Sequence, residues 1–150
     1  MEKDEVLKEV EAGFEELIAT VRALDERAMS RVCVGTWTAK EILAHITGWH
    51  RTMTGALERM ARGERPTPEG VDYGDADAWN AGFAAGARAQ QGATIVAGLQ
   101  QSFANYLRAA RALPPDRFGE GKTANRLLET SSYGHYREHL PALEHLGGRD

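Results

Sequence analysis

Apolar residues recur at alternating spacings of three and four positions along the first part of the chain. That spacing places them on one face of a helix of about five turns, with Lys, Glu and Arg at most positions between them. The six residues of this stripe are Leu7, Val10, Phe14, Leu17, Val21 and Leu24. We predict a first helix from about Lys3 to Met29, which Gly13 weakens by about 1 kcal/mol relative to alanine without ending it.

A second helix begins with a clear start signal after a linker at residues 30–37. Thr38 and Glu41 have the spacing of a capping box, in which each side chain accepts a hydrogen bond from the backbone N–H of the other residue. Trp37 and Ile42 flank them as the two partners of a hydrophobic staple. A broad apolar face then continues to Gly63, where we expect the helix to end; its members are Ile42, Leu43, Ile46, Trp49, Met53, Leu57 and Met60.

Residues 63–75 form a predicted loop, because this stretch of 13 residues contains two prolines and three glycines. Such a loop is long for a connection between antiparallel neighbours in a helical bundle. Fully extended it reaches about 43–47 Å, and a helix of about 22 residues is about 33 Å long. The loop is therefore long enough to cross from one end of a bundle to the other.

The remainder of the chain predicts three further helical segments. Residues 76–90 form a shorter and weaker helix, and Gly92 kinks or ends it. Residues 93–112 form the next helix, which the Pro114-Pro115 pair ends, and the last helix runs from about Thr123 to Leu146. No strand-like alternation of useful length is present. The pattern predicts an all-α four-helix bundle with one long crossover loop, in a single domain over residues 1–150.

Composition narrows the class of protein. The 150 residues include 18 Lys or Arg and 22 Asp or Glu, which gives a net charge of −4. We therefore predict no nucleic-acid partner, because such proteins usually carry a basic patch. No apolar run reaches the ~18 residues of a membrane span, and the charged N-terminus is not a signal peptide. We expect a cytoplasmic protein that does not contact a membrane.

The histidines carry the candidate chemistry. His135 and His139 are four positions apart, so their imidazoles lie about 40° apart on one helix face, the spacing of a two-point metal chelate. His45 lies on the apolar face of the second helix and is either a third ligand or a core histidine. His50 and His145 fall 140° and 120° away from these faces, and we expect both to be exposed to solvent.

Three imidazoles would leave coordination positions open, which is typical of catalytic rather than structural sites. A metal so held activates a bound water or thiol, and imidazole ligands suit Zn, Ni, Cu or Fe. The single cysteine, Cys33, has no histidine near it in sequence and is expected to be a small buried residue.

Several other residues near these histidines have two interpretations. Ser131, Ser132 and Glu138 either orient the imidazoles by hydrogen bonds or form a polar helix flank, and Trp49 is either a platform for a ligand or a core residue. Tyr133 and Tyr136 either contact a substrate or face solvent, and Gly48 and Gly134 either leave room above a metal or allow close helix packing.

Residues 37–49 (WTAKEILAHITGW) and 135–139 (HYREH), together with 77–81 (DAWNA), resemble the DinB-like (YfiT-like) metalloenzymes. The resemblance implies a four-helix bundle of unusual connectivity, often a homodimer. It also implies a divalent metal, commonly zinc or nickel, bound by His45, His135 and His139. The family includes proteins similar to thiol-dependent S-transferases, to hydrolases and to a mycothiol-dependent isomerase. The absence of a second domain after the bundle argues against the isomerase.

These observations lead to a functional hypothesis. The protein is expected to be a metal-dependent enzyme of the thiol S-transferase or hydrolase type. It would act on a small molecule, with a low-molecular-weight thiol as a possible co-substrate. No catalytic residue besides the metal ligands is assigned. The alternative is a non-catalytic stress-related or ligand-binding bundle whose histidine cluster is structural or vestigial.

Overall fold

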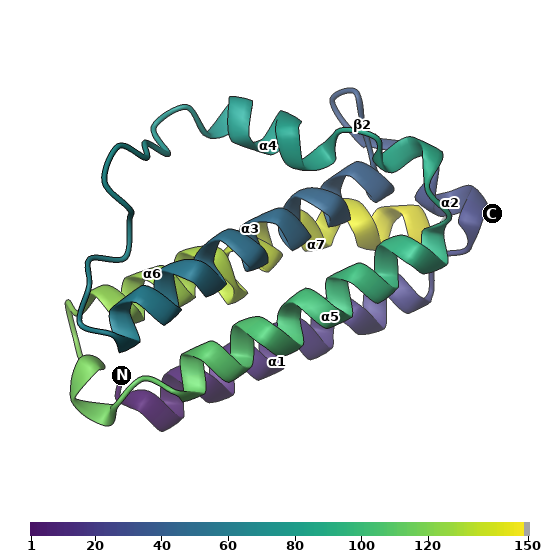
Figure 1. Cartoon of the computed structure of the whole chain (residues 1–150). Helices are drawn as coiled ribbons and strands as arrows, with labels where there is room; N and C mark the ends of the chain where they lie inside the picture. The colour runs from purple at the N-terminus through teal and green to yellow at the C-terminus, as the bar shows by residue number, and fades with distance from the viewer. Residues whose placement is uncertain (149–150) are drawn as a thin grey trace.

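Four long helical segments run side by side in the computed structural model, which describes residues 1–148 (Figure 1). Three are single helices, and the fourth is a pair joined at a break. Their bounds are α1 Lys3–Arg22, α3 Ala39–Ala61, α5 Gly92–Arg111, and α6 Thr123–Ser131 followed by α7 Tyr133–Gly147. The predicted all-α four-helix bundle is confirmed.

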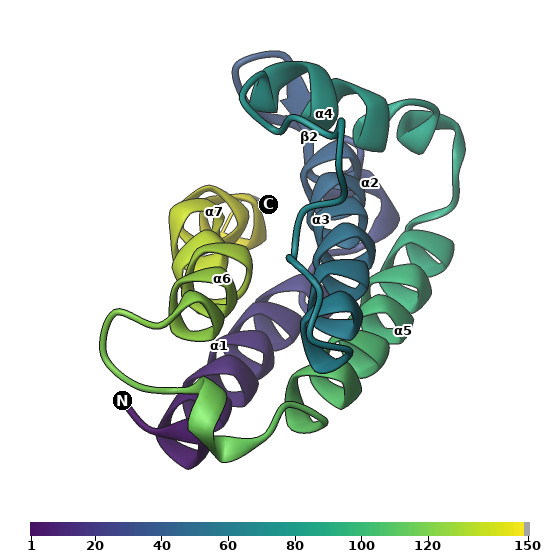
Figure 2. The same ribbon diagram turned by 60° about the vertical axis from the view of Figure 1, so that its left-hand side comes forward.

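The connection after α3 makes the bundle unusual. A loop over residues 62–75 leaves the far end of α3 and runs back beside it to α4 (Ala76–Ala84), as Figure 1 shows. The short 3-10 helix η1 (Ala87–Ala89) then leads into α5, so α3 and α5 run in the same direction and pack along each other. The predicted crossover is confirmed, and it places α4 outside the four long segments, over one flank of α3 (Figure 2).

The chain between α1 and α3 differs from the prediction. The first helix ends at Arg22, and a separate short helix α2 (Glu26–Met29) follows, with the Asp25 carboxylate accepting a hydrogen bond from the Ala28 N–H at 2.8 Å. The predicted linker at residues 30–37 is not plain, because the strands β1 (Val32–Val34) and β2 (Trp37–Thr38) pair antiparallel over residues 32–38. Strands this short show no alternation in sequence, and Gly35 makes the turn at a φ of 56°.

The later helices also differ in detail. The single helix predicted for residues 123–146 breaks at Ser132, whose φ and ψ are −127° and −104°. The helix predicted for residues 76–90 ends at Ala84, because Ala85 adopts an extended conformation with ψ of 129°. Gly92 does not kink a helix but begins α5, where its N–H donates to the Glu26 carboxylate at 2.7 Å. A further 3-10 turn, η2 (Pro115–Arg117), precedes α6.

The apolar stripe of α1 is the centre of the core. Val10 and Leu17 are fully buried, and the Phe14 ring stacks on Phe103 of α5 with ring centroids 3.8 Å apart. Burial of several such side chains, each contributing about 1.5–3 kcal/mol, holds the long segments together. No helix in the described part of the chain has the length and hydropathy needed to span a bilayer.

Candidate metal centre

The N-terminus of α3 fixes one side of the candidate site. The Thr38 hydroxyl accepts a hydrogen bond from the Glu41 N–H at 3.3 Å, and the Glu41 carboxylate accepts from the Thr38 N–H at 2.9 Å. This is the predicted capping box, and it satisfies two otherwise unpaired N–H groups. His45 lies one turn further along α3, with the Trp37 ring edge-on to its imidazole at 5.2 Å.

The other side of the site comes from α7, which approaches α1 closely. A Cβ on Gly13 would lie 2.8 Å from the Cβ of Tyr133, so α1 has room for the first turn of α7 only because residue 13 is glycine. Tyr133 is followed by His135 and His139, one turn apart on the face that points to α3. Close packing against α1 therefore sets where the two imidazoles lie.

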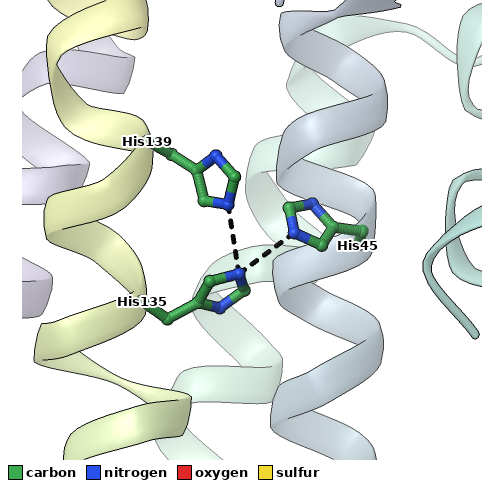
Figure 3. Close-up of side chains that lie close together, drawn as sticks. All are labelled: His45, His135 and His139. Carbon is green, nitrogen blue, oxygen red and sulfur yellow. Dashed lines mark hydrogen bonds between the residues drawn. The ribbon is translucent and has the colours of Figure 1, made fainter. Parts of the chain in front are cut away.

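Figure 3 shows the three imidazoles converging from the two helices. The Nε2 atom of His135 lies 3.0 Å from Nε2 of His45 and 3.1 Å from Nε2 of His139. One ligand nitrogen from each residue lies within 4.8 Å of the others. The structure thus brings together the three residues that the sequence analysis selected from segments 90 positions apart.

One of the three rings has its tautomer fixed by the backbone. The Ile42 carbonyl can only accept, so the contact of 2.5 Å means that His45 donates from Nδ1. The remaining nitrogen, Nε2, therefore carries a lone pair and faces the other two imidazoles. A backbone carbonyl behind the ring is the usual device that orients a metal-binding histidine.

Burial keeps these imidazoles neutral. Burial is the largest cause that lowers the pKa of His45 to about 4 and that of His135 to about 3, and the charges of neighbouring histidines contribute to both values. Burial also lowers the pKa of His139, and the carboxylate of Glu138 partly opposes that change. Neutral imidazole is the form that binds metals, so at neutral pH no proton competes for these nitrogens.

The donor set fits a divalent cation. Two nitrogens about 2.05 Å from one ion lie about 3.3 Å apart in tetrahedral geometry, close to the shorter contacts in this cluster. Among residues 1–148 no fourth His, Cys, Asp or Glu joins the group. Three protein ligands leave room for a water or a substrate atom, which is the pattern of catalytic sites.

A cleft of about 350 Å³ lies beside the cluster and includes His135 in its wall. We call it the α3–α4–α6–α7 cleft, after the helices that form it. Its lining residues are Trp49, Met53, Tyr73, Ala76, Asn80, Thr130, Ser131, His135 and Glu138. One of the three candidate metal ligands, His135, therefore faces a space that a small molecule can enter.

The prediction that His50 is exposed is wrong. His50 is fully buried, and its ring nitrogens lie 2.8 Å from the Ser102 hydroxyl and 2.5 Å from the Tyr136 hydroxyl. The prediction assumed that α3 buries one face, but α3 packs against both α5 and α4, and the hydroxyl partners of His50 come from α5 and α7. His145 is exposed, as expected.

The structure also places the other residues that had two interpretations. The hydroxyl groups of Ser131 and the buried Tyr106 are hydrogen-bonded at 2.6 Å, and Tyr133 and Tyr136 are buried rather than exposed. A Cβ on Gly48 would lie 2.2 Å from the Phe83 ring, so this glycine allows α4 to dock on α3. Cys33 is half-buried in β1, rather than a core residue.

Gly134 and Ser132 lie at the junction of α6 and α7. A Cβ on Gly134 would lie 2.7 Å from the Glu129 carbonyl, so this glycine relieves the backbone at the α6–α7 break. Ser132 is fully buried and its hydroxyl donates to the Leu128 carbonyl. Neither residue forms a hydrogen bond with a histidine nitrogen, so we assign a structural role to both. Trp49 and Glu138 line the cleft.

Comparison with known proteins gives a family and a fold. Residues 10–124 match the sequence profile described as the mycothiol maleylpyruvate isomerase N-terminal domain. This range includes His45 and ends before His135. No curated protein sequence matches the chain.

Solved structures share the fold at low sequence identity. The colibactin self-resistance protein ClbS, crystallised in complex with a dsDNA, superposes with a TM-score of 0.83 at 14% identity, covering 98% of this chain and 96% of that one. A Streptococcus pneumoniae protein superposes at 0.79, with 15% identity and 97% and 90% coverage. An uncharacterised protein from Escherichia coli UTI89 superposes at 0.75, with 17% identity and 96% and 91% coverage.

The ClbS complex corrects the prediction about partners. The sequence analysis excluded nucleic acid because the net charge is −4, yet a protein of this fold has been crystallised with dsDNA. A whole-chain charge says nothing about how charges are distributed over a surface, and phosphate contacts depend on the local distribution. The exclusion of nucleic acid is wrong.

Proposed function

The chain belongs to the mycothiol maleylpyruvate isomerase N-terminal domain family, within the DinB/YfiT-like all-α proteins, and on that premise we propose that it is a divalent-metal-dependent enzyme. The proposed metal ligands are His45, His135 and His139, and Zn²⁺ and Ni²⁺ are the proposed ions because imidazole ligands suit both. The proposed reaction is the transfer of a thiol to, or the hydrolysis of, a small molecule.

The convergence of three imidazole nitrogens beside an open cleft carries the proposal. A divalent ion held there supplies a Lewis acid that makes a bound water or thiol a stronger nucleophile. The chain's own residues keep the metal-binding nitrogens oriented and unprotonated. The Ile42 carbonyl orients His45, and burial keeps the three rings unprotonated at neutral pH. The cleft holds the second reactant next to His135.

Metal analysis of purified protein tests this proposal. The chain is stripped with a chelator, dialysed against Zn²⁺ or Ni²⁺, and assayed for bound metal per chain. We expect about one ion per chain for the unchanged protein and loss of tight binding for His135→Ala, because two remaining ligands hold a divalent ion far more weakly. Circular dichroism checks that the variant retains its helices.

The matched control is His145→Ala, which removes an exposed histidine from the same helix. It is expected to bind metal like the unchanged protein. Equal binding by the His135 variant, or no binding by the unchanged protein after loading, contradicts the proposal. The second outcome would favour the non-catalytic bundle with a structural histidine cluster.

Double-stranded DNA is a second candidate partner, favoured by the ClbS complex alone. Fluorescence anisotropy with a labelled duplex tests it. If DNA is bound through phosphates, the affinity falls steeply between 50 and 200 mM salt, by about 10³-fold or more for six contacts. An anisotropy that does not rise with protein at low salt removes this candidate.

A further inference from the structure

An aromatic wall forms one side of the α3–α4–α6–α7 cleft. The rings of Trp49 and Tyr73 meet edge to face with centroids 5.7 Å apart. Tyr73 comes from the crossover loop, which is held in place because the indole N–H of Trp79 donates to the Asp72 carbonyl at 2.9 Å. Met53 completes this apolar side. Such a wall favours a flat apolar group, because aromatic faces and edges pack well against other rings.

Asn80 gives this wall one directed hydrogen-bond donor. The indole N–H of Trp49 lies 2.6 Å from the Asn80 side-chain oxygen. Because an indole N–H can only donate, the amide oxygen must face it, and the orientation of the amide is fixed. The NH₂ group of Asn80 forms no hydrogen bond with residues 1–148, so it is available to an acceptor in the cleft, such as a carbonyl oxygen.

The charge of the cleft comes from a single side chain. Glu138 is the one charged residue in the lining, because His135 is neutral at neutral pH, and it forms no ion pair with another side chain in the described part of the chain. No Lys or Arg belongs to the lining. An anionic group beside Trp49 and Asn80 would therefore lack a positive partner among the side chains and would face a carboxylate.

We propose, building on the metal-dependent function above, that this cleft selects an uncharged substrate with a flat apolar body and a carbonyl-type acceptor, and discriminates against carboxylates. Trp49 and Tyr73 hold the body, Asn80 donates to the acceptor, and Glu138 repels anions. The maleylpyruvate named in the family description is a dicarboxylate, so this chain is not expected to take it: one carboxylate can approach the histidines, but the second has no cationic partner in the cleft.

Two probes of nearly equal shape test the selection: 3-phenylpropanamide, which is neutral, and 3-phenylpropanoate, which is anionic. Binding is measured by ligand-observed NMR and by quenching of tryptophan fluorescence. Both the chelator-treated chain and the zinc-loaded chain are used, after circular dichroism has shown that each is folded. The metal-free measurement isolates the cleft's own residues from the charge of an ion.

In the metal-free chain at low salt we expect the amide to bind about tenfold more tightly than the carboxylate, the size expected from one like charge a few ångströms away at the surface of a protein. Glu138→Gln should reduce this ratio to about twofold, and Asn80→Ala should weaken the amide about fivefold with little change for the carboxylate. The control Glu144→Gln removes the same charge from an exposed position on α7 outside the cleft, and should leave the ratio unchanged.

Three results would overturn the inference: a carboxylate that binds as tightly as the amide, a ratio that Glu138→Gln does not change, or no binding of either probe at millimolar concentration. Failure of the proposed metal function has a different signature. The metal analysis would then show no bound ion, while the preference for the amide would persist in the metal-free chain.

Discussion

The molecule contains two histidine environments, one fully buried around His50 and one partly buried around the three-histidine cluster, that are adjacent in space but differ in their hydrogen bonding. In the first, the Ser102 hydroxyl donates to the Leu99 carbonyl at 3.0 Å and so accepts from Nδ1 of His50, while the Tyr136 hydroxyl donates to Nε2. In the second, Nε2 of His135 faces two further imidazole nitrogens. His135 and Tyr136 are consecutive on α7, so a rotation of about 100° separates the two environments.

The difference shows that burial alone does not mark a metal site. Burial lowers the pKa of His50 and of His135 alike, to about 3 in each case. What differs is the use of the nitrogen lone pairs. Both nitrogens of His50 have hydroxyl partners, so this ring joins α3, α5 and α7. The three-histidine cluster instead brings one nitrogen from each ring within 4.8 Å of the others beside a cleft, where a cation would satisfy their lone pairs.

Acid should give the largest effect on stability, and it acts on both environments. Below pH 6.5 the unfolded chain protonates its histidines, whereas the folded, metal-free chain keeps His50 and His45 neutral down to about pH 3 and 4. The unfolded state therefore binds more protons, and the free energy of unfolding falls as pH falls, by up to about 1.4 kcal/mol per pH unit for each such histidine.

Urea unfolding of the metal-free chain at several pH values between 7 and 4 measures this slope. In His50→Leu the slope should decrease by up to about 1.4 kcal/mol per pH unit, because one proton fewer is taken up on unfolding. A slope that stays the same in this variant would mean that His50 is already protonated in the folded protein.

The next effect distinguishes the two environments directly. His50→Ala should lower the free energy of unfolding of the metal-free chain by about 3 kcal/mol, since it leaves a cavity and removes the partner of the buried Tyr136 hydroxyl. His139→Ala leaves no buried hydroxyl without a partner and should cost about 1 kcal/mol. Equal losses, measured by urea unfolding at pH 7.5, would erase the distinction between the two regions.

Metal should stabilise through the three-histidine cluster alone. At a zinc concentration about 100 times the dissociation constant, the free energy of unfolding should rise by about 2.7 kcal/mol, which corresponds to about 5–10 °C in Tm. A thermal scan with and without zinc measures it. The stabilisation should be absent in His139→Ala and present in a folded His50 variant. A Tm that zinc raises equally in the His139 variant would place the ion elsewhere.

The sequence predicted one of these environments and missed the other for a physical reason. The spacing of His135 and His139 and the resemblance carried by residues 37–49 selected the cluster. His50 was misassigned because a helical wheel with one apolar face assumes one buried side, whereas α3 has neighbours on two sides. The hydroxyl partners Ser102 and Tyr136 come from other helices, and nothing local to His50 indicates them.

The parts of the fold that were predicted are those with strong local signals. The α1 stripe, the capping box at Thr38 and the long loop each depend on short-range spacing or composition. The break at Ser132 and the cleft depend on contacts between distant segments, such as the approach of Gly13 to Tyr133 and the hydrogen bond from Trp49 to Asn80. No periodic pattern of residues in the sequence predicts those contacts.

The smallest expected effect tests whether zinc binding by the three-histidine cluster depends on the local stability of the first turns of α3. Thr38→Ala removes the hydroxyl of the capping box and should lower the free energy of unfolding by about 1 kcal/mol. The loss is concentrated in the first turns of α3, next to His45 and remote from His50, which lies another turn and a half along the helix. We therefore expect zinc affinity to weaken a few-fold while the acid dependence contributed by His50 persists.

Isothermal titration with zinc and the pH series described above measure the two quantities on the same variant. Zinc affinity equal to that of the unchanged protein would show that packing against Trp37 and the Ile42 carbonyl holds His45 without the cap, and the cluster would then be as rigid as the His50 network.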